Sequence, residues 1–321
     1  MNKVKNYIIE TIKLLQNFMK NLSIFFKNNK SKIINKFLKK IFLIKKNTGP
    51  EILRNNLIRG LKQNLISINI NPNIRDIFRN CLILDDVDAL KKIINLKKNK
   101  KNIKIIAGPN LMIMPDEYNK VLYKKEINKI IVPCKWVKKK YLEVSKNKLK
   151  NKLSIWPSGV DHNYWKPGKN KKIDFLIYSK FIKNNEIFNQ CIDYLKTKKF
   201  KIKVLKYGGY NAGKYLNLLK QTKNAVFFSQ SESQGLAYFE AWSTNVPTLV
   251  YNPNEKYRSS YKTKAHSCPY LNKKLGDEFK TFSAFKIKLK LFLKNKSFNP
   301  RSEILNKYTL NKAAKKLIKI I

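Results

Sequence analysis

Residues 229–242 read SQSESQGLAYFEAW, and the interpretation of the whole chain starts from this stretch. The apolar run 225–229 that leads into it is typical of a buried strand, and a helix is expected to begin near Gly235, after the Ser-rich turn. The first N–H groups of a helix have no partner within it, so the amides of Gly235, Leu236 and Ala237 can bind an anion. The stretch therefore predicts an anion-binding turn at the carboxyl end of a strand.

Two carboxylates flank this expected helix start. Glu232 precedes the helix and Glu240 follows about one and a half turns into it, so both can face one ligand. A carboxylate accepts hydrogen bonds from the vicinal hydroxyls of a sugar or a ribose. The alternative is a solvated helix start with an ordinary cap. The Gly turn, the Glu-Ala continuation and Pro247 leading into a strand make the pattern specific.

Apolar strand candidates alternate with helical stretches along most of the chain. Strands are expected at 40–44, 65–70, 81–84, 103–107, 130–132, 153–156, 175–179, 202–206, 225–229 and 248–251, with helices such as 88–96, 136–144, 186–196 and 215–221 between them. Parallel strands need crossover connections, so this alternation predicts an α/β fold with parallel sheets. It restarts after Pro167. We therefore expect two Rossmann-like domains facing each other across a cleft, at 40–165 and 166–321, preceded by a segment at 1–39.

The first segment has a helical pattern of its own. Apolar residues recur in steps of three and four with lysines between them, namely Ile8, Ile12, Leu15, Met19, Leu22 and Phe26. This predicts a basic amphipathic helix. Such a helix either lies in a membrane interface, where anionic lipid attracts its lysines, or packs on its own domain. No run approaches the ~18 apolar residues that a spanning helix needs.

The charge of the chain is extreme for an enzyme. It has 69 Lys and Arg against 20 Asp and Glu, a formal net charge of +49. Clustered cations indicate a polyanion partner. Against that, the excess is nearly all Lys, is accompanied by abundant Asn and Ile, and is spread along the chain, which is also the product of a strongly AT-rich coding sequence. The sequence leaves both explanations open.

The four cysteines fit no metal site. Their spacing matches neither a C-x-x-C pair nor a zinc pattern with histidine, and they are Cys81, Cys134, Cys191 and Cys268. We expect ordinary buried thiols. No signal peptide is apparent, because Glu10 and Lys13 break any apolar core, so the expected compartment is the reducing cytoplasm.

Residues 232–250 resemble the E-S-x-G-x-x-x-x-E-A-x-x-x-x-x-P-V element of the glycosyltransferase family 4, or group 1, enzymes. Residues 156–167, WPSGVDHNYWKP, are similar to the P-x-G-V-D-x-x-x-F-x-P segment that links the two domains of that family. Weaker matches are Thr48-Gly49-Pro50, which looks like the glycine turn after the first strand, and 132–136, which resembles a P-S-x-W helix start. The resemblance covers roughly residues 41–321 and implies the GT-B fold.

The resemblance also implies roles for individual residues. Glu240 would bind the ribose of a nucleotide-sugar donor, and Glu232 would face the transferred sugar. The amides at 235–237 would hold the diphosphate. Lys180 matches the position of the family's diphosphate-binding Arg, although a Lys lacks the bidentate fork. The family's second basic residue has no match, and Lys183 is the substitute we expect.

Neither a cofactor nor a metal ion is expected, because lysines and the helix terminus would neutralise the diphosphate. Gly49 would be a donor-side turn glycine, although a turn glycine needs no ligand to explain it. Many relatives carry a histidine in the amino-terminal domain near the reacting sugar, whereas the two histidines here, His162 and His266, lie outside it. Asn110, in the loop after the 103–107 strand, is either a polar substitute on the acceptor side or a turn residue.

We therefore expect a glycosyltransferase of hexosyltransferase type that transfers a sugar from a nucleotide-diphosphate-sugar donor to a glycan or lipid-linked hydroxyl acceptor. Retention of configuration is the habit of the family that it resembles. Polysaccharide, lipopolysaccharide or glycolipid synthesis, with peripheral contact at the inner membrane face through the N-terminal segment, is the expected setting. The alternative is a non-catalytic protein of the same fold that binds nucleic acid or another polyanion, although nucleic acid is not the expected partner.

Overall fold

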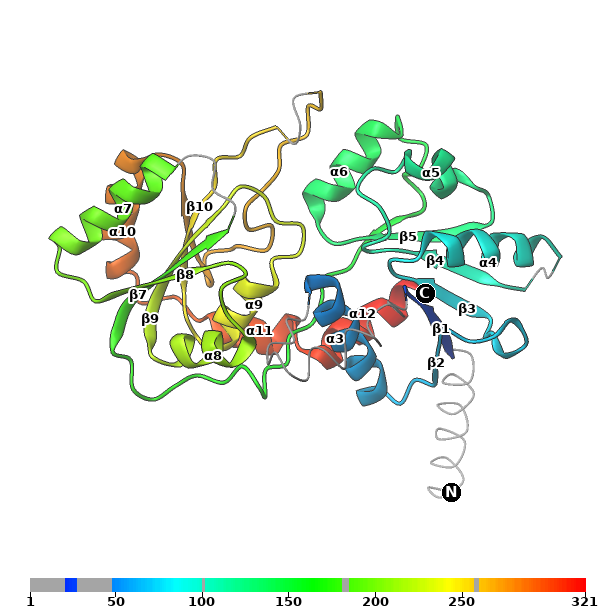
Figure 1. The fold of residues 1–321 in the computed structure, drawn as a ribbon, viewed down its shortest axis with the longest axis horizontal. Helices are drawn as coiled ribbons and strands as arrows, with labels where there is room; N and C mark the ends of the chain where they lie inside the picture. Colours follow the sequence, from blue (N-terminus) through cyan, green and yellow to red (C-terminus); the bar gives the residue numbers. More distant parts are fainter. Residues whose placement is uncertain (1–20, 28–47, 100–101, 181–184, 257–259) are drawn as a thin grey trace, which may run out of the picture. The chain divides into compact units, whose positions relative to one another are not determined.

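The computed structural model describes residues 21–27, 48–99, 102–180, 185–256 and 260–321, which form two compact units (Figure 1). The first unit takes its described residues from Met1–Pro133, Tyr141–Gly159 and Leu310–Ile321, and the second from Cys134–Lys140 and Val160–Thr309. Each unit is built on one parallel sheet, so the predicted α/β class with two sheets is confirmed.

The first unit has a six-stranded sheet in the order β2-β1-β3-β4-β5-β6, and all neighbouring strands are parallel. Its strands are β1 (Leu22–Phe25), β2 (Ile68–Ile70), β3 (Asn80–Ile83), β4 (Lys104–Ala107), β5 (Ile127–Val132) and β6 (Leu153–Ile155). Its helices are α3 (Gly49–Gln63), α4 (Val87–Asn99), α5 (Glu117–Lys120) and α12 (Leu310–Ile320), with the short η1 (Ile74–Asp76) and η2 (Val121–Tyr123), while α6 (Lys135–Val144) contains residues of both units.

The second unit has a five-stranded parallel sheet in the order β11-β10-β9-β7-β8. Its strands are β7 (Ile173–Lys180), β8 (Ile202–Lys206), β9 (Thr222–Ser229), β10 (Thr248–Tyr251) and β11 (Gly276–Phe279). Its helices are α7 (Asn185–Thr197), α8 (Ala212–Lys220), α9 (Leu236–Ser243), α10 (Phe282–Lys294) and α11 (Pro300–Lys307).

Strand β1 contradicts the helix predicted from the N-terminal apolar repeat. Residues Leu22–Phe25 are all buried and pair with β2 on one side and β3 on the other. A strand inside a parallel sheet is covered on both faces, so four consecutive buried residues suit it better than an amphipathic helix. Phe26, 9% exposed, belongs to the same core and not to a membrane-facing stripe. The rest of the repeat, at 8–19, and the strand expected at 40–44 lie outside the described residues.

Helix α12 returns to the first unit at the end of the chain, whereas the sequence placed it with the second. Its buried side chains Ala313, Ala314 and Leu317 pack with the apolar face of α3 and with the sheet (Figure 1). A Cβ at Gly60 of α3 would lie 2.4 Å from the carbonyl oxygen of Leu310, so this close approach of the two helices requires glycine. The domain boundary expected at 166–321 therefore differs from the observed division.

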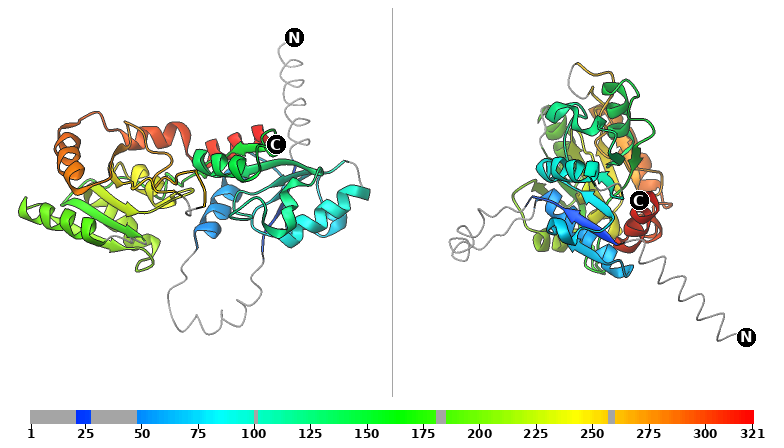
Figure 2. Two further views of the ribbon diagram at one scale, coloured as in Figure 1. Left: turned by 90° about the horizontal axis from the view of Figure 1, so that it is seen from above. Right: turned by 90° about the vertical axis from the view of Figure 1, so that its right-hand side faces the viewer.

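The second unit carries helices on both faces of its sheet (Figures 1 and 2). Alternate residues of β7 and β9 point to opposite sides, as the two-residue period of a strand requires. Phe175 and Ile177 pack with α7 and α10 on one face, whereas Leu176 and Tyr178 pack with α8 and α9 on the other. Both faces are apolar cores, which leaves the carboxyl ends of the strands as the place for polar side chains.

Two further predictions can be compared with the structure. All four cysteines are buried and free, as expected of ordinary thiols. None of the helices in the described part of the chain is long and apolar enough to cross a membrane.

Candidate functional site

The chain order of the second sheet reverses between β7 and β9. Strand β8 follows β7 on one side, and β9 continues on the other, so the loops after β7 and β9 leave in opposite directions. Ligands of open α/β sheets bind outside the carboxyl ends of the strands at such a switch point. The register aligns Lys180, the last residue of β7, with Ser229, the last residue of β9. The quoted motif therefore begins at the switch point.

An ion pair joins the two loops there. The Lys180 Nζ donates to the Glu232 Oε1 at 2.7 Å, and their side chains are 23% and 14% exposed. Burial raises the pKa of the Glu232 carboxyl, and the charge and hydrogen bond of Lys180 oppose that shift. The Lys180 Nζ also lies 4.8 Å from the ring centroid of Tyr207. A cation and a half-buried carboxylate that are 52 residues apart in the chain are thus brought together at the ends of two neighbouring strands.

The turn after Glu232 ends in a helix at the predicted position. Gly235 precedes α9 in the left-handed conformation, with a φ of 67° that suits glycine. A Cβ at Gly235 would lie 2.9 Å from the Tyr238 ring and 3.7 Å from the Glu232 Cβ, so the turn is tight. Leu236 and Ala237 are the first residues of α9, and their N–H groups begin the helix without an intrahelical acceptor.

Glu240 lies within α9 and is half-buried. Within the described part of the chain its carboxyl group has no hydrogen-bond or ion-pair partner, and burial raises its pKa to about 8. Its neighbours are tyrosines: burial first, and the charge of Glu240 as well, raise the pKa values of Tyr178, Tyr210 and Tyr215. A carboxyl group without a partner, next to phenol rings, can bind a polar ligand.

Hydrogen bonds hold these tyrosines in place. The Tyr210 hydroxyl donates to the Tyr178 hydroxyl at 2.9 Å, and the Tyr215 hydroxyl donates to the carbonyl oxygen of Ala237 at 2.9 Å. The second bond ties α8 to the first turn of α9. The rings also contact one another, with Tyr210 and Tyr215 centroids 5.2 Å apart. These hydrogen bonds and ring contacts join the tyrosines into one aromatic cluster beside the first turn of α9.

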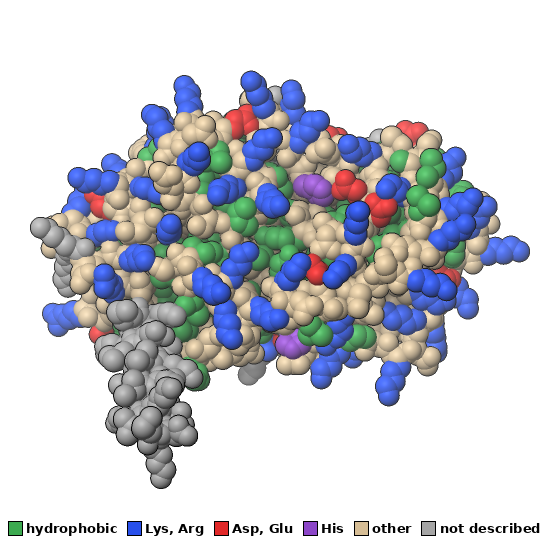
Figure 3. Space-filling view, turned by 180° about the vertical axis from the view of Figure 1, so that it is seen from behind, with side chains coloured by type: hydrophobic (Ala, Val, Ile, Leu, Met, Phe, Trp, Pro, Cys, Tyr) green, Lys and Arg blue, Asp and Glu red, His purple; other side chains and the backbone are tan. Residues whose placement is uncertain are grey.

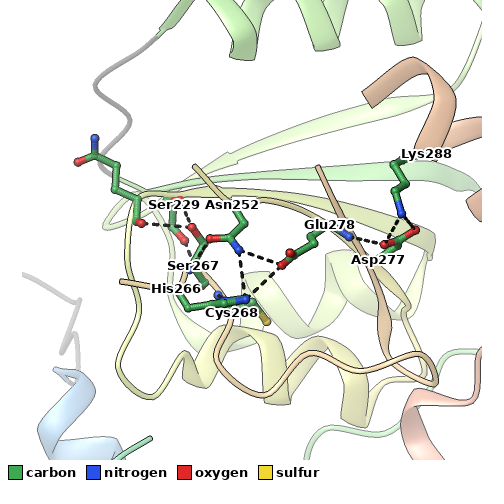
Figure 4. Close-up of polar contacts among 9 residues, drawn as sticks. Ser229, Asn252, His266, Ser267, Cys268, Asp277, Glu278 and Lys288 are labelled. Atoms are coloured by element: carbon green, nitrogen blue, oxygen red, sulfur yellow. Dashed lines mark hydrogen bonds and ion pairs between the residues drawn. The ribbon is translucent and has the colours of Figure 1, made fainter. Parts of the chain in front are cut away.

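A second set of contacts fixes the backbone of the turn (Figure 4). The N–H of Glu232 donates to the carbonyl oxygen of His266 at 2.9 Å. The Ser267 hydroxyl lies 2.7 Å from the carbonyl oxygen of Ser229 and 3.2 Å from that of Gln230. The loop that contains His266 and Ser267 therefore holds three residues of the turn through main-chain atoms.

The side chains of β10 and β11 hold that loop in turn (Figure 4). Asn252 accepts from the N–H of Ser267 at 3.2 Å and donates to Glu278 at 2.9 Å. The His266 Nδ1 accepts from the N–H of Cys268 at 2.9 Å, so the neutral ring carries its proton on Nε2, 3.2 Å from Glu278. The hydrogen bond from His266, followed by that from Asn252, lowers the pKa of the Glu278 carboxyl.

The remaining residues predicted for the site lie elsewhere. Gly49 is the first residue of α3 in the first unit, and a Cβ there would meet nothing within 4 Å. No close approach requires glycine at this position, and the Glu51 carboxylate, in the first turn of α3, accepts from the N–H of Thr48 at 2.8 Å. Asn110 is half-buried in the turn after β4, also in the first unit. Lys183 lies outside the described residues.

Sequence reasoning missed several residues around the turn. The sequence does not predict that Tyr178 and Tyr215 lie at the site, because a tyrosine within a strand or a helix is typical of an ordinary core residue. Asn252 follows β10 at the same sheet edge as the motif. Because ligands of open α/β sheets bind outside the carboxyl ends of the strands, its position after a predicted strand could have indicated it. His266 reaches the turn through an irregular loop, and no sequence pattern indicates that approach.

Comparison with known proteins identifies the fold. No protein-family model and no curated protein matches the sequence. The chain is similar to the solved structure of the lipopolysaccharide outer core galactosyltransferase WaaB in its apo form, with a TM-score of 0.56, 9% identity, and coverage of 94% of this chain and 98% of that one. The chain is also similar to sucrose-phosphate synthase from Thermosynechococcus elongatus, with a TM-score of 0.55 and 10% identity, and the match covers 94% of this chain and 98% of that one. The GtfA/B complex gives 0.51 and 10% identity, and the match covers 75% of this chain and 56% of that chain.

At such identities the likeness establishes the fold alone. Both the galactosyltransferase and the synthase are matched over nearly their whole length, and the chain shares their GT-B arrangement of two Rossmann-like domains. The fold expected from the resemblance of residues 156–167 and 232–250 is therefore confirmed.

Proposed function

We propose that this protein is a glycosyltransferase that moves a sugar from a nucleotide-diphosphate donor to a hydroxyl acceptor. The observation that carries the proposal is the grouping of Lys180, Glu232 and Glu240 around the start of α9 at the switch point of the second sheet. A cation, a helix N-terminus and two carboxyl groups are the chemistry that a nucleotide sugar needs: the first two suit its diphosphate, and the carboxyl groups suit its diols.

Each group has a proposed role. Lys180 and the amides of Gly235, Leu236 and Ala237 bind the diphosphate, and Glu232 positions the transferred sugar. Glu240 binds the ribose, and its raised pKa leaves a neutral carboxyl group that both donates and accepts at neutral pH. The GT-B folds of the galactosyltransferase and of sucrose-phosphate synthase agree with this assignment.

In the proposed reaction the bond between the anomeric carbon and the β-phosphate oxygen breaks, and its electron pair leaves with the nucleoside diphosphate. The acceptor oxygen forms the new glycosidic bond, and the proton of its hydroxyl passes to the departing diphosphate. Preorganised positive charge at Lys180 and at the helix start stabilises that leaving group, so no metal ion is proposed. Retention of configuration, as in the family that the sequence resembles, is part of the proposal.

The acceptor is proposed to be a glycan or lipid-linked hydroxyl, used in polysaccharide, lipopolysaccharide or glycolipid synthesis. Peripheral contact with the inner membrane face through the lysine-rich start of the chain is part of this proposal. Leu22 and Phe26 do not contribute to such contact, because both belong to the core of the first unit. The residues that remain for it, at 8–19, lie outside the described part.

A non-catalytic protein that binds a polyanion is the second candidate, because the net charge is +49. Figure 3 shows Lys and Arg side chains scattered over the visible face and not gathered over one element. A nucleic-acid surface normally concentrates its cations along one face or groove. On this face the scattered pattern favours the compositional explanation of the charge.

A thermal-shift panel tests the proposal. UDP, GDP, ADP and their glucose conjugates are added to the wild type, to Glu240→Gln and to Asp193→Asn, which neutralises an exposed carboxylate of α7 as a control. One nucleotide class is expected to raise the Tm of the wild type and of Asp193→Asn, and to leave Glu240→Gln unchanged. Equal stabilisation of all three proteins by heparin, without any nucleotide effect, would favour the polyanion-binding candidate.

A further inference from the structure

Gln234 lies in the turn between Glu232 and Gly235, and its side chain has no partner. The residue is 7% exposed, and both its Nε2 and its Oε1 are buried without a hydrogen bond to any of the residues that the structure describes. Within that part of the chain four buried side-chain nitrogen or oxygen atoms lack a partner, and two of them belong to this one amide. Half of the unpartnered buried side-chain atoms among the described residues therefore lie at this turn.

A buried amide without partners costs free energy, because water solvates both of its polar atoms in the unfolded chain. Leucine or methionine has nearly the same volume and would carry no such cost in the free protein. The turn around Gln234 is also held in place, because the N–H of Glu232 donates to the carbonyl oxygen of His266 and the Ser267 hydroxyl donates to the carbonyl oxygen of Gln230. The amide therefore keeps two unmet hydrogen bonds in the free protein, which a ligand that reaches it would satisfy.

The chemistry of the amide narrows the choice of ligand. A carboxamide donates through Nε2 and accepts through Oε1. Phosphate oxygens only accept, so a diphosphate would satisfy Nε2 and leave Oε1 without a partner. A pair of neighbouring hydroxyl groups both donates and accepts. The ribose and the transferred sugar both carry such a pair, and Gln234 follows Glu232, the residue proposed to face the transferred sugar, by two positions.

We propose that Gln234 binds hydroxyl groups of the transferred sugar and sets the specificity of the donor site for that sugar. This inference rests on the proposed function and deepens it. Glu232, an acceptor when ionised, and Gln234, a donor and an acceptor, together distinguish the arrangement of hydroxyls on the sugar. The nucleoside diphosphate is bound independently of Gln234, by Lys180 and Glu240.

The test compares Gln234→Leu with Gln190→Leu, which makes the same substitution on the surface of α7, where the amide bonds to Glu186. Gln234→Met is a second variant of similar volume, in case leucine does not pack. Each protein is titrated with UDP, GDP and ADP and with UDP-glucose, UDP-galactose, GDP-mannose and ADP-glucose. The readouts are the Tm of the free protein, the Kd of each nucleoside diphosphate, and the ratio of that Kd to the Kd of each nucleotide sugar that contains the same nucleoside diphosphate.

The free Gln234→Leu protein is expected to melt above the wild type. It should bind the preferred nucleoside diphosphate with unchanged Kd, and it should lose about tenfold or more in affinity for the preferred nucleotide sugar, with less discrimination among sugars. Gln190→Leu should match the wild type in all binding readouts. An equal loss for diphosphate and conjugate would assign Gln234 to the base or ribose and overturn the proposal.

Unchanged affinities together with a lowered Tm would show that Gln234 is structural, with water or another part of the chain as its partner, and would also overturn it. A wild type that binds none of the nucleotides refutes the proposed function itself. The two failures can be told apart: if the wild type binds a nucleoside diphosphate and Gln234 has no effect on the sugar, only the inference about Gln234 is wrong.

Discussion

Lys180, which forms an ion pair with Glu232, is expected to bind the diphosphate of the donor, so its loss should weaken that binding. Lys180→Ala removes a charged donor, and hydrogen bonds to charged groups contribute about 1.5–3 kcal/mol, so the Kd of the preferred nucleoside diphosphate should rise by roughly 10- to 150-fold. Lys180→Arg keeps the charge and should lose much less. Lys223→Ala is the matched control, because Lys223 also forms an ion pair, at 2.9 Å, with Asp174. Calorimetric titration measures all four proteins, and equal affinities would contradict the role of Lys180.

Glu240 makes stability depend on pH in a defined direction. Its folded pKa is about 8 against an ordinary 4.5, so between these values the unfolded chain releases a proton that the folded protein retains. Rising pH therefore destabilises the wild type, whereas Glu240→Gln lacks this effect. Between pH 5 and pH 8.5 the free energy of unfolding of Glu240→Gln should therefore rise relative to that of the wild type. Because Glu240 keeps part of its exposure, we expect a rise of about 1–2 kcal/mol, or roughly 3–6 °C in Tm. A Tm difference that is independent of pH would refute the raised pKa.

At the scale of elements, the start of α9 depends on Gly235. Alanine there must adopt a φ of 67°, and its Cβ would meet the Tyr238 ring at 2.9 Å, so Gly235→Ala should destabilise the protein by about 1–3 kcal/mol. Gly213→Ala in α8 is the control, because its Cβ would meet nothing closer than 3.5 Å and a helical alanine is favoured over glycine. Denaturant unfolding measures both variants. A neutral or stabilising Gly235→Ala would contradict the observed turn.

How far the sequence predicts the structure differs from element to element. The strand and helix on either side of residues 230–235 were predicted within a few residues, because apolar runs and a glycine turn are local signals. Strand β1 was mistaken for a helix, because four residues buried on both faces have no alternation that distinguishes the two. The return of α12 depends on a contact with Gly60 that spans most of the chain, and a local pattern does not record it.

At the candidate site, too, contacts between residues far apart in the chain were harder to predict than local patterns. Lys180 and Glu232 were placed in one site by resemblance, and the sheet register shows how strands β7 and β9 bring them together. The unpartnered amide of Gln234 was not foreseen, since a glutamine in a polar turn has no sequence signature of burial. The tie between Glu232 and His266 was missed because it runs through main-chain atoms, which any residue type provides.

At the scale of the whole molecule, the two units should respond separately to damage in α12. Ala314→Glu places a carboxylate in the interface with α3, where Ala314 is fully buried, and should destabilise the first unit by about 3–5 kcal/mol. Lys315→Glu adds the same group on the exposed side of the helix as a control. Hydrogen exchange should increase in β1 and α3 and remain unchanged in β7 and β9. Equal loss of protection in both sheets would contradict the division into two units.

The site around α9 is proposed to transfer sugars. The most direct measurement of this transfer is the release of nucleoside diphosphate from nucleotide sugars, with water and a panel of alkyl glycosides as acceptors. The wild type and Asp193→Asn should release the diphosphate from at least one donor, whereas Glu232→Gln and Lys180→Ala should be slower by roughly 100-fold, as is typical for loss of one preorganised charged group. A rate equal to that without enzyme for every protein, including the wild type, or equal activity of all four proteins, would contradict sugar transfer at this site.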